Sequence, residues 1–141
     1  MAAPSAPHWA KRADYGLAMR FKPSNLLIRR FSEDNSVTQS DAEECFEETK
    51  KFLVLCHAMQ GQPLSPSKWV DKMWHRFLLH TREYGEFCRR LGGFVHHQPS
   101  DGPVEGQVEM TCSSMLAFYG SVNDRFWQSS PSDCSSCDCC P

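Results

Sequence analysis

The chain has 141 residues, enough for one domain with a hydrophobic core and too few for two. Its formal charge of −2 excludes a broad electrostatic attraction to nucleic acid or anionic membranes. No apolar run approaches the roughly 18 residues of a membrane span, and the N-terminus lacks the apolar core of a signal peptide. We therefore expect a cytoplasmic protein with neither nucleic acid nor membrane as a partner.

Eight cysteines are present, and four of them fall between positions 134 and 140. Without an export signal the expected compartment is reducing, so the thiols are expected to be free or metal-bound. The other four lie within apolar periodic patterns and are predicted to be buried thiols that pack as small hydrophobic groups: Cys45, Cys56, Cys88 and Cys112.

The first predicted helix follows a flexible N-terminus of residues 1–12 and a segment, 25–31, whose composition does not decide between helix and strand. Apolar residues recur at steps of three and four over 36–59, which predicts an amphipathic helix. Ser40 and Glu43 have the spacing of a capping box at its start.

A second stripe of apolar residues runs over 66–91 and predicts one helix, bent near Thr81 and ended by Gly92 and Gly93. Ser65 is the expected cap, with a proline in the first helical position.

A third helix is predicted over 105–122, with a last turn at 123–128 that packs Trp127. The sequence thus predicts an all-α fold: a single bundle of three to four main helices over residues 13–128, followed by a Ser- and Cys-rich tail over 129–141.

One stretch of the second helix carries candidate functional side chains. Asp71 and His75 are four apart and therefore share a helical face, where a carboxylate can orient a histidine that binds a metal or acts as a base. His96 and His97 follow in a loop that can fold back, so His75, Cys88 and one of these two histidines form a candidate zinc ligand set. The same side chains also fit the interpretation that they are ordinary structural polar groups.

The stretch 71–88 also resembles a known family. Asp71, Trp74, His75, Tyr84 and Cys88 occupy the places of the recurring Asp, Trp-His, Tyr and Cys of the glycine-rich-domain-containing-protein-like family, a domain of unknown function found in plant and bacterial proteins. The resemblance covers about residues 40–128, where Tyr119, Gly120 and Trp127 match a later segment. It implies no catalytic activity, and the chain lacks the family's glycine-rich run.

The tail carries the other candidate site. Cys134, Cys137, Cys139 and Cys140 place four sulfur donors within seven residues, and thiolates favour zinc, copper(I) or an iron–sulfur cluster. A redox-active or disulfide-bonded tail is an alternative.

Three functional hypotheses follow. The leading one is a non-catalytic cytoplasmic helical domain whose thiolate tail binds zinc or copper(I). The second is a metalloenzyme with a site centred on His75, using Asp71 and His96 or His97. The third is an adaptor or modification substrate whose Ser/Cys tail is processed by a partner protein.

Overall fold

The structure is a computed structural model that describes residues 15–60, 62–97 and 106–127. Within these ranges the chain is all-α: it has six α-helices, one short 3-10 helix and no strand. The elements are α1 (Gly16–Met19), α2 (Asn25–Asn35), α3 (Gln39–Ala58), α4 (Lys68–Leu79), α5 (Thr81–Leu91), α6 (Gln107–Tyr119) and η3 (Asp124–Phe126). The predicted fold class is confirmed, but the count of three to four helices is too low.

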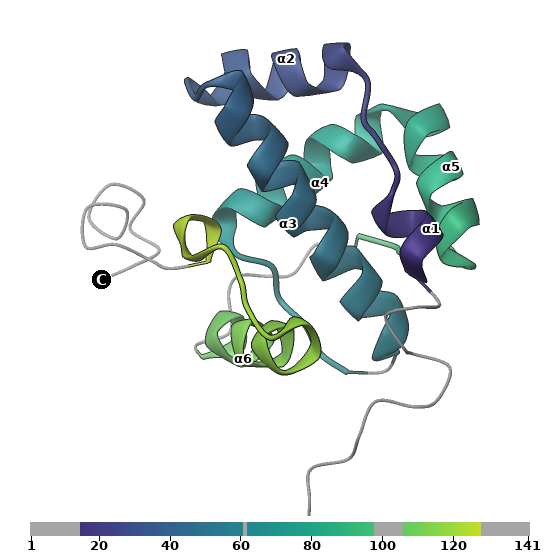
Figure 1. Ribbon diagram of the computed structural model, residues 1–141, viewed down its shortest axis with the longest axis vertical. Coiled ribbons are helices and arrows are strands. Elements are labelled where there is room, and N and C mark those ends of the chain that lie inside the picture. The colour runs from purple at the N-terminus through teal and green to yellow at the C-terminus, as the bar shows by residue number, and fades with distance from the viewer. Residues whose placement is uncertain (1–14, 61, 98–105, 128–141) are drawn as a thin grey trace, which may run out of the picture.

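The longest helix, α3, organises the fold. It runs through the middle of the molecule (Figure 1) and contacts α1, α2, α4 and α6. Because neighbours cover most of its sides, it is buried along most of its length rather than along one stripe. Fully buried apolar side chains of α3 include Cys45, Phe46, Phe52, Leu53, Val54 and Leu55.

The start of α3 differs from the predicted capping box. Thr38 is the N-cap, and its hydroxyl accepts a hydrogen bond from the backbone N–H of Asp41. Ser40 already lies in the first helical turn and cannot cap it. Two residues before Ser40, Thr38 has the extended backbone that an N-cap requires, with φ −73° and ψ 162°.

The predicted helix over 66–91 is two helices: next to the expected bend near Thr81, the chain breaks at His80 into α4 and α5. The rings of Phe77 and Tyr84 pack edge to face with centroids 4.9 Å apart. Residues seven apart in a continuous helix are separated by about 10.5 Å along its axis. The break therefore lets both helices direct their aromatic side chains into the same core. The predicted end is confirmed: Gly92 has a left-handed backbone at φ 96°.

The serine residues before α4 also differ from expectation. Ser67, not Ser65, caps α4 by accepting a hydrogen bond from the N–H of Val70. Ser65 instead bonds to α6, where its backbone N–H donates to the hydroxyl of Thr111 and its own hydroxyl bonds to the side chain of Gln107. Ser65 thus holds the connection between α3 and α4 against α6.

The C-terminal part of the described chain follows the prediction more closely. The third predicted helix is α6, and the last turn is η3, after which Trp127 is 5% exposed. The predictions for residues 1–12 and for the tail 129–141 lie outside the described residues. Over the described part of the chain, no helix is both long and apolar enough to cross a membrane.

Candidate metal centre

Two of the predicted site residues lie one turn apart on α4. Asp71 follows the Ser67 cap in the first turn, and His75 lies one turn later on the same face. The Nε2 atom of His75 is 3.6 Å from Oδ1 of Asp71. The expected proximity of these two side chains is confirmed. Both are open to solvent, with 43% of the Asp71 side chain and 60% of the His75 side chain exposed.

The turn after α5 returns the chain to α4. The backbone N–H groups of Gly92 and Gly93 both donate to the carbonyl oxygen of Cys88, which closes the end of α5. Gly93 passes close to His57, since a Cβ atom added to it would lie 3.0 Å from the imidazole Nε2. The following segment then carries Val95 into the core and brings His97 to the side of α4.

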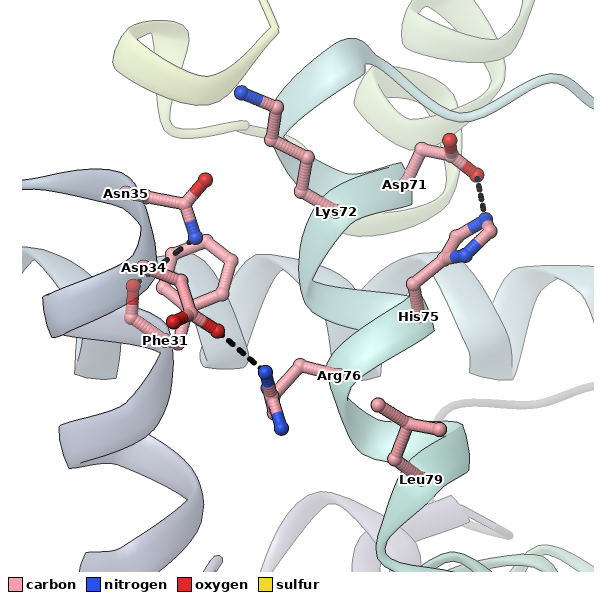
Figure 2. Close-up of a pocket in the computed structure, with 8 residues that line it drawn as sticks. All are labelled: Phe31, Asp34, Asn35, Asp71, Lys72, His75, Arg76 and Leu79. Carbon is pink, nitrogen blue, oxygen red and sulfur yellow. Dashed lines mark hydrogen bonds and ion pairs between the residues drawn. The ribbon is translucent and has the colours of Figure 1, made fainter.

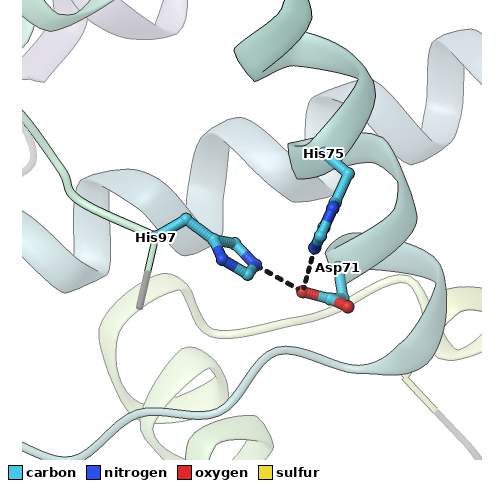
Figure 3. Close-up of side chains that lie close together, drawn as sticks. All are labelled: Asp71, His75 and His97. Atoms are coloured by element: carbon cyan, nitrogen blue, oxygen red, sulfur yellow. Dashed lines mark hydrogen bonds and ion pairs between the residues drawn. The ribbon is translucent and has the colours of Figure 1, made fainter. Parts of the chain in front are cut away.

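His97 is the third member of the cluster. Its Nε2 atom lies 2.8 Å from Oδ1 of Asp71, the same oxygen that the ring of His75 approaches. Figure 3 shows the two imidazoles directed at this carboxylate from different segments. One potential ligand atom from each of the three residues lies within 4.8 Å of the other two. The side chain of His97 is only 15% exposed, so it is the most buried member of the cluster.

The ring of His97 is held between two other rings. Its centroid is 4.4 Å from that of Trp74, with planes at 65°, and 4.3 Å from that of His75, with planes at 78°. Trp74 is buried, whereas His75 is exposed, so His97 bridges the core and the surface.

The other two ligands predicted in the helical body, His96 and Cys88, lie away from the cluster. His96 is exposed and packs on the ring of Phe94, with centroids 4.7 Å apart. Cys88 is buried beside the Tyr84 hydroxyl and the backbone of Val95, and burial raises the pKa of its thiol. Within the described residues, neither belongs to a group of potential ligands that could share one ion. The tail ligands Cys134, Cys137, Cys139 and Cys140 lie outside the described residues.

A surface pocket of about 340 Å³ adjoins the cluster between α2 and α4. Asp71 and His75 belong to its lining, and an ion pair between Arg76 and Asp34 crosses it (Figure 2). The remaining lining residues are Phe31, Asn35, Lys72 and Leu79. The exposed side of the cluster is therefore reached through a concave surface of the size that small ligands occupy.

Two imidazole nitrogens and one carboxylate oxygen are a ligand set that divalent zinc and related transition metals accept. Spacing alone could not choose between His96 and His97, or between Asp71 and Cys88 as the ligand beside the histidines. The contacts of Trp74 and Tyr84 were also not apparent from spacing. One indication of Trp74 and Tyr84 was present in the sequence: both belong, with Asp71 and His75, to the motif that resembles the glycine-rich-domain-containing-protein-like family.

Comparison with known proteins gives one result. The sequence model of a family described as UCP032817-like, whose function is unknown, matches residues 12–111. This range contains all of α1 to α5 and the whole Asp71, His75 and His97 cluster. No curated protein and no solved structure gives a significant match.

Proposed function

The chain belongs to the UCP032817-like family, and we propose that it binds a divalent transition-metal ion, with zinc as the first candidate, through Asp71, His75 and His97. The observation that carries this proposal is the convergence of both histidine rings on one oxygen of Asp71, with Nε2–Oδ1 distances of 2.8 and 3.6 Å.

The donor spacing supports the proposal. Donor atoms about 2.0–2.1 Å from a tetrahedral zinc ion lie about 3.3 Å from one another. The separations of the two histidine nitrogens from Asp71 lie on either side of that value, and all three donor atoms lie within 4.8 Å of one another, so rotation of a side chain such as His75 can adjust them. His75 lies on the exposed side, where such a rotation meets little resistance.

The number of ligands indicates the kind of site. Structural zinc sites are closed by four protein ligands, whereas three ligands leave a position for water or another ligand. The exposure of His75 and the adjoining pocket support a site whose open position would be within reach of solvent. This is the geometry that the second sequence hypothesis, a metalloenzyme, requires. The proposal itself is limited to metal binding and names no substrate.

The test is a zinc titration by calorimetry on the full chain with its four tail cysteines replaced by serine, so that only the body can bind. We expect uptake of one ion, weakened at least tenfold by His75→Ala or His97→Ala. His96→Ala is the matched control, because His96 neighbours His97 in sequence but packs on Phe94. No uptake, or an equal loss in the His96 variant, would refute the site.

Two expectations from the sequence stay proposals beside this one. The first is that Cys134, Cys137, Cys139 and Cys140 bind zinc or copper(I) in a cytoplasmic protein. The second is that residues 40–128 resemble the glycine-rich-domain-containing-protein-like family, whose motif includes Asp71. The alternative of a tail processed by a partner protein predicts a mass change confined to the tail in protein from its native host.

A further inference from the structure

A buried chain of hydrogen bonds lies directly behind the candidate metal centre. The indole Nε1–H of Trp74 donates to the hydroxyl oxygen of Tyr84 at 3.1 Å, and that hydroxyl bonds to the carbonyl oxygen of Val95. An indole N–H can only donate and a carbonyl can only accept, so the single hydroxyl proton must point to Val95. The hydrogen bonds therefore run in one direction, from the donor on α4 through the Tyr84 hydroxyl on α5 to the acceptor carbonyl in the loop.

The bond to Val95 is well protected. Tyr84 is 2% exposed and packs edge to face against Phe77 and Phe94, with centroids 4.9 and 5.3 Å away. Burial raises the pKa of the Tyr84 phenol, so it keeps its proton and remains a donor. Water cannot easily replace a hydrogen bond in such surroundings, which makes this contact a rigid attachment of the loop.

The loop that this bond attaches is the one that carries His97. Val95 lies two residues before His97. Trp74 donates to Tyr84 and also packs on the His97 ring, with ring centroids 4.4 Å apart. The backbone of the loop and the ring at its end are thus located by the same pair of buried aromatic residues.

We propose that Tyr84 is a positioning residue for the metal centre: through its bond to Val95 it holds His97 beside Asp71, where the two side chains can share one ion. This inference rests on the proposed function, because it assigns His97 as a ligand. Loss of a group that orients a metal ligand typically weakens binding by 10- to 100-fold. Without the attachment, His97 must be ordered during binding, and we expect Tyr84→Phe to weaken zinc binding by at least tenfold.

The experiment is a double-mutant cycle measured by zinc calorimetry on the full chain with serine at the four tail positions. The variants are Tyr84→Phe, His97→Ala and their combination. Since Tyr84 acts through His97, its substitution should weaken binding in the presence of His97 and have no further effect once His97 is alanine. Equal losses in both backgrounds would overturn the inference, because Tyr84 would then act on the whole fold.

Tyr119→Phe is the matched control. The Tyr119 hydroxyl also donates to a backbone carbonyl, that of Lys51, at 2.9 Å, but it links α6 to α3 away from the cluster. Its loss should leave zinc affinity unchanged within twofold. A tenfold loss in this variant would mean that affinity follows general stability, and the role assigned to Tyr84 would be wrong.

A second measurement does not need metal. The imidazole NMR signals of His97 in the metal-free protein should be displaced by the ring current of Trp74, and Tyr84→Phe should move them toward the values of histidine in an unfolded peptide. The backbone signals of α3 report whether the variant is folded. Unmoved His97 signals in a folded variant would overturn the inference alone, whereas absence of zinc binding by the parent would overturn the proposed function and the ligand role together.

Discussion

The carboxylate of Glu48 accepts a hydrogen bond from the indole N–H of Trp127 at 3.1 Å. The same oxygen accepts a second one from the backbone N–H of Asn123 at 3.0 Å, and the other oxygen pairs with Lys51. Glu48 is only 4% exposed, although it lies in the middle of α3. This buried charge therefore attaches the C-terminal segment to the central helix.

Glu48→Ala should lower the free energy of unfolding by about 2–4 kcal/mol, because the buried indole N–H of Trp127 and the partly buried backbone N–H of Asn123 lose their acceptor, at about 1–3 kcal/mol for a buried donor. Urea denaturation followed by tryptophan fluorescence measures this change. Glu44→Ala is the control on the same helix: its exposed carboxylate bonds to Asn123 and Arg125, and its loss should cost less than about 1 kcal/mol. Equal costs in both variants would contradict the anchoring role of Glu48.

Trp74→Ala should cost about 3–5 kcal/mol, the usual range for removing a large buried aromatic side chain. Trp74 is 6% exposed, packs against Phe52 with centroids 5.5 Å apart and donates to Tyr84. Thermal and urea unfolding should both detect the loss. A cost below about 1 kcal/mol would show that the core does not depend on this ring.

The fold class could be predicted from the sequence because apolar residues recur at helical spacing, most strongly in α4 and α5. For α4 and α5, the sequence predicted a bend near Thr81 but not a break into two helices. The apolar stripe passes through His80 without interruption, so local pattern favours one helix. Tertiary contacts that the local pattern does not reveal, such as those of Phe77 and Trp74 with Tyr84, hold the two halves against each other. The cap at Thr38 was missed because Ser40 and Glu43 fit the same motif two residues later.

Only part of the candidate metal centre could be predicted from the sequence. Helical spacing places Asp71 beside His75, which is a local relationship. The approach of His97 depends on the turn at Gly92 and on the bond between Tyr84 and Val95, which are tertiary relationships. Sequence spacing therefore named both loop histidines as candidates, and the buried position of Val95 decides which of them faces α4.

His57 should make stability depend on pH. Its Nδ1 atom lies 3.0 Å from the Tyr15 hydroxyl, its ring contacts the Gly92 and Gly93 turn, and burial lowers its pKa below the ordinary value of about 6.5. The unfolded chain binds a proton at His57 more readily than the folded chain, so acidification favours unfolding. The stability that neutral His57 contributes is complete above its ordinary pKa and is lost as pH falls toward its lowered pKa in the folded protein.

The measurement is urea unfolding of the parent and of His57→Gln at pH 7.5 and 5.5. All other residues are the same in both proteins, so the difference between them isolates His57. We expect the parent to lose more stability on acidification than the variant. Equal losses would show that protonation of His57 does not oppose folding.

Replacement of Cys134, Cys137, Cys139 and Cys140 with serine should remove a second class of zinc or copper(I) binding from the full chain and leave its helical circular dichroism unchanged. Four sulfur donors within seven residues need only short loops to surround one ion, which costs little entropy. The tail has no large apolar side chain that could join the core, so its substitution should not alter stability. Each thiol must lose its proton to become a ligand, and this binding should therefore weaken as pH falls below neutrality.

His97→Ala with an intact tail is the complementary variant, because it should keep metal binding by the tail thiolates and lose metal binding by the helical body. If the serine variant binds as much metal as the parent, the tail is not a site; if its helical signal falls, the tail contributes to the fold.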